Sequence, residues 1–138
     1  MKKTLSMIVI AAAGFGLTAS ASFAATGSKA DYEAAKTQAK TDYEKAKDAC
    51  KSMSGNAKDV CEAQAKADRT KTEANAEAAY KGTPKAKAKA QKDIAEANYK
   101  VDKQKCDDMK GDQKDACQKQ AKATEKSAEA QAKATEGK

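Results

Sequence analysis

Two related stretches of the sequence decide the fold: CKSMSGNAKDVC at residues 50–61 and CDDMKGDQKDAC at residues 106–117. Each places two cysteines symmetrically about a glycine that is followed by Asn or Asp, residues that favour tight turns. The second stretch repeats the first at an offset of 56 residues, and the match extends outward to Tyr43 and Tyr99. Such self-similarity indicates a duplicated structural unit.

The segments on both sides of these turns are rich in Ala, Lys, Glu and Gln, which favour the α-helix. A third turn is predicted at Gly82-Thr83-Pro84, where glycine can end one helix, threonine can cap the next and proline suits its first turn. We therefore expect four antiparallel helices joined by short turns. Their expected bounds are about 29–54, 57–81, 84–110 and 113–135. At the cysteine-flanked turns we expect a left-handed glycine followed by an N-cap residue: Gly55 with Asn56, and Gly111 with Asp112.

The four cysteines allow three disulfide connectivities. Positions that lie symmetrically about the turn of an antiparallel helical hairpin face one another, so we predict the local pairs Cys50–Cys61 and Cys106–Cys117. Neighbouring alanines leave room for the close approach that a bridge requires. One continuous helix through each turn would instead hold the two cysteines of a pair about 16 Å apart.

A periplasmic metal or thiol-redox protein is an alternative use of the cysteines. Met53 and Met109 each lie three residues after a cysteine, and soft Cys and Met ligands would suit Cu(I). However, the wide cysteine spacing and the lack of histidine are unlike a zinc site, and the redox motif Cys-x-x-Cys is absent. We therefore interpret the four cysteines as structural and expect no cofactor.

Hydrophobic residues form 40% of the chain, but most of those after residue 24 are alanine. Alanines at helical spacing give narrow apolar stripes, close to the seam of a coiled coil, which bury little area per residue. The predicted fold is therefore all-α, with two disulfide-stapled antiparallel helical hairpins. We expect these hairpins to be elongated or to form a loosely packed four-helix bundle.

Residues 1–24 have the three parts of a secretory signal peptide. Two lysines precede an apolar stretch that is short for a membrane span, and small residues at Ser22 and Ala24 precede a cut before Ala25. We expect cleavage near Ala24 and a periplasmic or secreted mature chain without a membrane span. The predicted domains are the signal peptide at 1–24, a first hairpin at 25–82 and a second at 83–138, whose C-terminal tail we expect to fray.

The chain carries 27 Lys and Arg against 20 Asp and Glu, a formal net charge of +7. Most charges are interspersed as on a solvated helix surface. The exception is KGTPKAKAKAQK at residues 81–92, which contains no acidic residue. Its lysines form a candidate binding segment for lipopolysaccharide, anionic lipid or nucleic acid: Lys81, Lys85, Lys87, Lys89 and Lys92.

The sequence contains no histidine and no tryptophan, which removes histidine-based acid–base and nucleophilic chemistry. A chain of this size without a Leu/Ile/Phe core also excludes a multidomain enzyme. We therefore interpret it as a non-enzymatic protein whose partner is an envelope protein or, alternatively, a polyanion. No small-molecule substrate is evident.

The signal-peptide pattern, the DYE-x-A-K segments at 31–36 and 42–47, and the paired Cys-x10-Cys hairpins support a family likeness. Over most of residues 1–123 the chain resembles small exported Ala/Lys-rich helical proteins of Gram-negative bacteria, often labelled TolA-like or cell envelope biogenesis. The repeating composition is also similar to late-embryogenesis-abundant stress proteins, which generally lack paired disulfides. True TolA proteins have a membrane helix and a globular C-terminal domain that we do not find here. The resemblance therefore implies a compartment and not a reaction.

Overall fold

A computed structural model describes residues 27–137, so the predicted signal peptide lies outside the described residues. The described part contains four α-helices: α1 (Lys29–Cys50), α2 (Gly55–Lys81), α3 (Pro84–Cys106) and α4 (Gly111–Glu136). No helix in this part is both long and apolar enough to cross a membrane.

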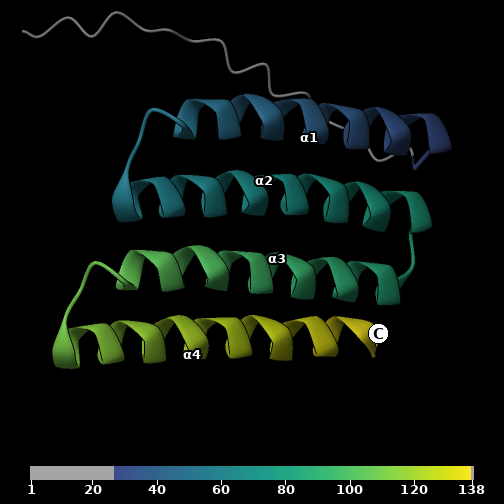
Figure 1. The fold of residues 1–138 in the computed structure, drawn as a ribbon. Coiled ribbons are helices and arrows are strands. Elements are labelled where there is room, and N and C mark those ends of the chain that lie inside the picture. The colour runs from purple at the N-terminus through teal and green to yellow at the C-terminus, as the bar shows by residue number, and fades with distance from the viewer. Residues whose placement is uncertain (1–26, 138) are drawn as a thin grey trace, which may run out of the picture.

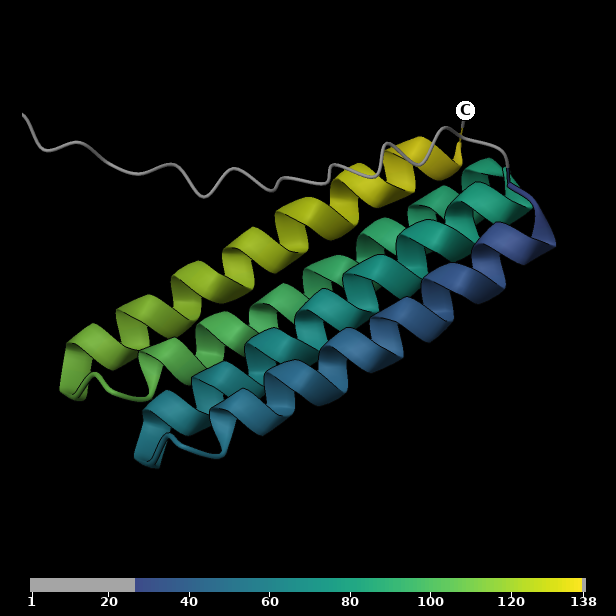
Figure 2. The same ribbon diagram turned by 90° about the horizontal axis from the view of Figure 1, so that it is seen from above.

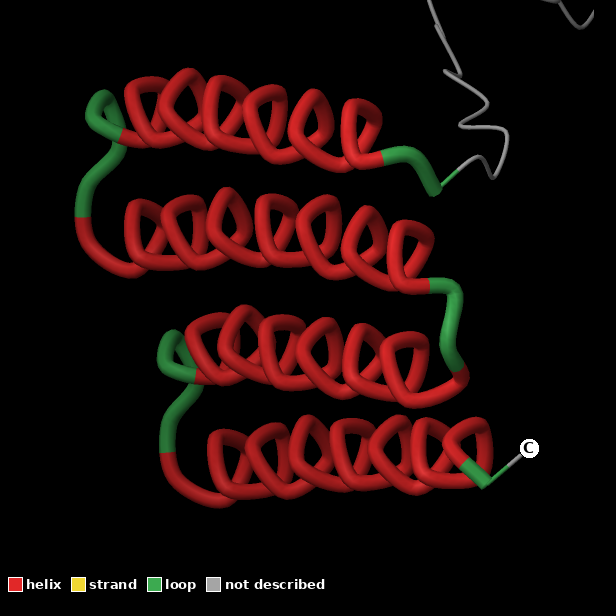
Figure 3. Tube along the Cα trace, turned by 90° about the vertical axis from the view of Figure 1, so that its right-hand side faces the viewer, coloured by secondary structure: helices red, strands yellow, loops and turns green. Residues whose placement is uncertain are grey.

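The four helices lie side by side in chain order, each antiparallel to the one before it (Figure 1). Views from above and from the side show the same order (Figure 2 and Figure 3). Each helix packs on its neighbours in the sequence, and among the described residues α1 makes no contact with α4. The helices therefore form an open bundle in which α2 and α3 are flanked on two sides and α1 and α4 on one. This arrangement confirms the predicted all-α fold of two stapled hairpins.

The turn between the hairpins is built as the sequence predicts. Gly82 ends α2 with a left-handed φ of 65°, and its N–H donates to the carbonyl of Ala78. The Thr83 hydroxyl accepts a hydrogen bond of 3.1 Å from the N–H of Ala86, and Pro84 opens α3. Each residue type thus meets the backbone requirement of its position.

The other two turns begin earlier than predicted. Helices α1 and α3 end at Cys50 and Cys106, about four residues before their expected ends. The chain needs the following residues to cross between two helices that the disulfides hold close together. Hydrogen bonds over three residues, such as that from the Met53 N–H to the Cys50 carbonyl, tighten the chain as it leaves the helix.

The N-cap prediction at these turns was wrong; the two glycines are left-handed as predicted, but they do not end α1 and α3. Gly55 and Gly111 have left-handed φ values of 58° and 54°. They are, however, the first residues of α2 and α4, so Ser54 and Lys110 take the N-cap positions, neither with a side-chain cap hydrogen bond. Asn56 and Asp112, the residues predicted to cap, therefore already lie in the first turn of their helices.

The apolar core lies mainly between the two hairpins. One cluster joins Ala67 of α2 to Ala97 and Val101 of α3, with Ala63 packed against it. A second cluster joins Ala74 and Ala78 of α2 to Ala90 of α3, with Ile94 packed against it. Small side chains let these helices approach closely but bury little area, which leaves the outer interfaces more dependent on the disulfides and on the tyrosines.

Candidate functional site

Both predicted disulfides are present. The Cα atoms of Cys50 and Cys61 are 5.7 Å apart, and those of Cys106 and Cys117 are 5.6 Å apart, within the usual range for a bridge. Cys50 and Cys106, the last residues of α1 and α3, are fully buried. The described part of the chain has no free cysteine. The four predicted cysteines therefore join each helix pair beside its turn.

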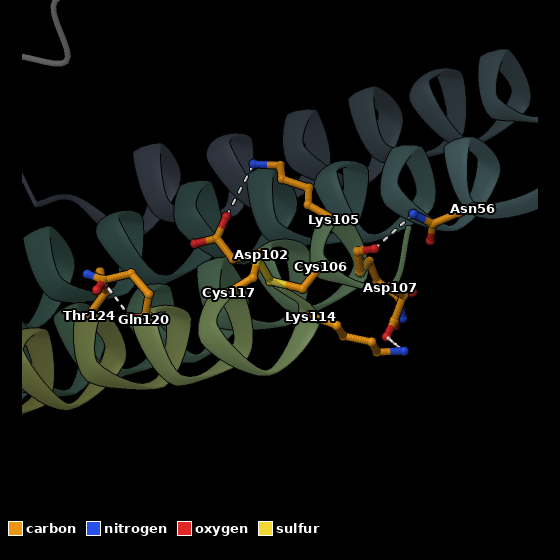
Figure 4. Close-up of a disulfide and its surroundings, with 10 residues drawn as sticks. Asn56, Asp102, Lys105, Cys106, Asp107, Lys114, Cys117, Gln120 and Thr124 are labelled. Atoms are coloured by element: carbon orange, nitrogen blue, oxygen red, sulfur yellow. Dashed lines mark hydrogen bonds and ion pairs between the residues drawn. A yellow bond between two sulfur atoms is a disulfide. The ribbon is translucent and has the colours of Figure 1, made fainter. Parts of the chain in front are cut away.

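Polar contacts tie the two bridged turns together, as Figure 4 shows around Cys106 and Cys117. The side-chain amide of Asn56, on α2, donates a hydrogen bond of 2.9 Å to the carbonyl of Gln104, on α3. Within the second hairpin, the Lys114 ammonium lies 2.8 Å from the Asp107 carboxylate. The contact from Asn56 joins the hairpins to each other near the bridged end.

This geometry bears on the metal and redox alternative. All four cysteine sulfurs are engaged in bridges, and a metal ligand or redox nucleophile requires a thiolate. Met53 and Met109 are exposed beside the bridged turns. Within residues 27–137, no group of three or more His, Cys, Asp or Glu residues is arranged to hold a metal ion. A thiol-based site would therefore require a bridge to open.

Tyrosines support the helix pairs along their length. In the first hairpin, Tyr32 and Tyr80 stack with ring centroids 5.3 Å apart, and the Arg69 guanidinium lies 5.4 Å from the Tyr43 ring centroid. The duplicate tyrosine Tyr99 instead receives the Lys122 ammonium, 4.8 Å from its centroid. The repeated tyrosines were visible in the sequence. Their cation–π partners Arg69 and Lys122 come from neighbouring helices and were not predicted.

The five lysines of the candidate polyanion segment lie at the end of the molecule opposite the disulfides. Lys81 is in the last turn of α2, and the others follow on α3. Two of the five form ion pairs one helical turn away: Lys81 with Glu77 at 2.6 Å, and Lys89 with Asp93. Among the described residues, the other three form no ion pair and are exposed: Lys85, Lys87 and Lys92.

Ion pairing shifts the pKa values of two side chains in and beside this lysine segment. The hydrogen bond from Lys81, helped by the charges of Lys81, Lys89 and Lys36, holds the pKa of the Glu77 carboxyl below its ordinary value. The hydrogen bond to Asp93 raises the pKa of the Lys89 ammonium. Both shifts favour the charged forms of Glu77 and Lys89, and the unpaired lysines provide the excess positive charge.

A hollow of about 420 Å³ gathers four of these lysines with residues of α4. Its rim contains Lys81, Lys85, Lys89 and Lys92 together with Lys133, and its apolar lining comes from Ala86, Ala88 and Ala132. Lys87 instead lines a separate, shallower depression with Pro84, Ala134 and Thr135. Sequence analysis missed Lys133 because only the pairing of α3 with α4 brings it to this end.

No protein-family model, curated protein or solved structure matches this chain.

Proposed function

We propose that the protein is a non-enzymatic, exported helical protein with a structural or interaction role in the cell envelope, including under envelope stress. The observation that carries this proposal is the pair of local disulfides, each beside a turn of the duplicated hairpin. Such bridges persist in oxidising compartments such as the periplasm. They also remedy the weak alanine seams, because they restrict the unfolded chain.

The shape of the molecule supports an interaction role. Helices α1 and α4 each leave one flank without a helical neighbour among the described residues. Their surfaces carry many charged side chains, and some of these pair within one helix, as Lys36 does with Glu33 on α1 and Lys122 with Glu125 on α4. An open row of helices presents a large surface for its size, which suits a partner that lies along it.

The decisive experiment is site-specific photo-crosslinking in the native envelope. We would place the photoreactive residue in turn at Gln38 on the free flank of α1, at Ser127 on the free flank of α4, and at Ala67 in the buried α2–α3 interface as a control. A partner that crosslinks from a flank but not from Ala67 would support the proposal. Failure to capture a partner, together with an unaltered envelope phenotype on deletion, would refute it.

The export step needs its own measurement. Fractionation should place the chain in the periplasm with its N-terminus near Ala25. Thiol labelling of denatured protein that was purified without reductant should detect no free thiol. Four free thiols would instead favour the metal or thiol-redox alternative.

Polyanion binding is a second candidate, favoured by the three exposed lysines without ion pairs. Lipopolysaccharide and nucleic acid both present phosphates, and counterion release would make binding weaken with salt. Replacement of Lys85, Lys87 and Lys92 by Gln should lower the affinity and flatten the salt dependence. The matched control replaces Lys103, Lys110 and Lys119, which are exposed elsewhere, and should change neither. Equal effects of the two triple variants would remove this candidate.

A further inference from the structure

The two hairpins have the same backbone arrangement, but their side chains differ at the end opposite the disulfides. Helices α1 and α3 both end at a repeat cysteine, and α2 and α4 both begin at a repeat glycine. The offset of 56 residues therefore holds along the helices, and it aligns Tyr32 with Ala88 and Tyr80 with Glu136. The stacked tyrosine pair that closes the first hairpin thus has no counterpart in the second.

The hollow lies where these rings are missing. Ala88 and Glu136 both line it, and its volume of about 420 Å³ falls within the range of roughly 300–1,000 Å³ typical of small-molecule sites. In the first hairpin two aromatic rings occupy the aligned positions, with centroids 5.3 Å apart. A flat apolar group therefore suits the hollow at the aligned place in the second hairpin.

The charged side chains at the rim of the hollow add a second requirement: a group bound there should carry negative charge. Five lysines and three glutamates surround the hollow, and Glu77 is already paired with Lys81. The aligned positions of the first hairpin lack this excess of lysines over glutamates, because Lys89 and Lys133 align with Glu33 and Glu77. The second hairpin thus combines an open apolar space with a cationic rim, and the first hairpin has neither.

We propose that the hollow lined by α3, α4 and the end of α2 binds a small anion with a flat apolar body, an aryl sulfonate, aryl carboxylate or aryl phosphate. The aromatic body lies against Ala86, Ala88 and Ala132, and the anionic group meets the ammonium groups of Lys85 and Lys92. This inference goes beyond the envelope role proposed above and does not depend on it.

Fluorescence titration of the oxidised protein with anilinonaphthalene sulfonate tests the site. The chain has no tryptophan, so protein emission does not interfere. We expect saturable binding at one site, with much weaker binding of the uncharged analogue N-phenylnaphthylamine. Linear, non-saturating binding, or equal affinity for the two probes, would overturn the proposal.

Ala88→Tyr places a ring where the first hairpin has one and leaves every lysine intact. We expect it to weaken binding of the sulfonate at least about tenfold. Tyr32→Ala is the matched control, because it opens the corresponding space without the cationic rim; it should add no second site. Wild-type affinity in a folded Ala88→Tyr protein would overturn the proposal.

Since Ala88 is buried, a second variant keeps the test valid if the tyrosine disturbs folding. Replacement of Lys85, Lys92 and Lys133 by Gln should weaken sulfonate binding about tenfold, whereas the same change at Lys103, Lys110 and Lys119 should not. Equal affinities would overturn the proposal. Heparin separates this site from the polyanion candidate: folded Ala88→Tyr protein should keep its affinity for heparin, because its lysines remain.

Discussion

Removal of the second disulfide should lower the free energy of unfolding by an amount set by the length of the loop that the bridge closes. The bridge joins cysteines 11 residues apart, and replacing Cys106 and Cys117 by Ala frees this loop in the unfolded chain. For a loop of this length the chain-entropy relation gives about 2.8 kcal/mol at 25 °C. A domain of ordinary stability has only about 5–15 kcal/mol in total, so this loss is a large fraction of it.

The same replacement at Cys50 and Cys61 opens a loop of equal separation, so the chain-entropy loss is the same. The consequences for the native state differ, because the first hairpin keeps its stacked Tyr32–Tyr80 pair. The second hairpin has no such pair at its open end, although α1 and α4 each pack on one helix alone. Loss of the second bridge should therefore loosen α4 more than loss of the first loosens α1.

Urea unfolding followed by helical circular dichroism gives the free energies, and native-state hydrogen exchange resolves the helices. Treatment of the wild-type protein with reductant is the control, since it should reproduce the two losses together. An unchanged urea midpoint after removal of either bridge would refute the chain-entropy argument. Faster exchange in α1 than in α4 of the corresponding variants would refute the ranking of the hairpins.

Three further changes test individual contacts. A double-mutant cycle of Tyr32→Ala and Tyr80→Ala should give a coupling of about 0.5–1.5 kcal/mol from the stacked rings, measured by urea unfolding. Gly55→Ala should lower the free energy of unfolding by about 1–2 kcal/mol, because φ is 58° there, whereas the added methyl meets no atom within 4 Å. Lys81 holds the pKa of Glu77 below its ordinary value of 4.5, so the unfolded chain binds the proton more readily. The stability from this pair is present above that value and lost as pH falls below it, and the loss should stay under about 1 kcal/mol in thermal melts at about pH 6 and pH 3.

Each of these predictions has a contrary result. Additive effects of the two tyrosine replacements would mean that the rings contribute burial but no stacking. If Gly55→Asn costs as much as Gly55→Ala, the left-handed backbone is not the cause, because asparagine tolerates this conformation better. If Glu77→Gln leaves the loss of stability at low pH unchanged, that loss comes from other carboxylates.

Local chemistry explains which parts of the fold could be predicted. The cysteine pairing followed from symmetry about a turn, and Gly82-Thr83-Pro84 carries its own signals for ending and starting a helix. The exact ends of α1 and α3 could not be predicted from the local sequence, because they depend on the distance that the chain must span between the bridged helices. Residue type at Asn56 suggested an N-cap, but Asn56 lies within the first turn of α2, and its side-chain amide donates to the carbonyl of Gln104 in the other hairpin.

The candidate site depended still more on distant residues. Lys81 to Lys92 form one run in the sequence, and that run was visible from composition alone. The structure divides it: Lys87 lines a separate depression, while Lys133 joins the others from α4. Nothing local to Lys133 distinguishes it from the many other lysines of the chain, so only the packing of α4 could identify it.

The two copies of the repeat differ at the positions that form the interface between the hairpins. The central α2–α3 interface contains Ile94 and Val101, and the repeat aligns them with Gln38 and Lys45 on the exposed side of α1. On the other partner, Ala63 aligns with the exposed Lys119 of α4. A helix packed on these faces in the geometry of α2 and α3 would bury the charges of Lys45 and Lys119, which is costly without partners. The two copies therefore share the bridged turn that closes each hairpin and differ at the positions that face the other hairpin.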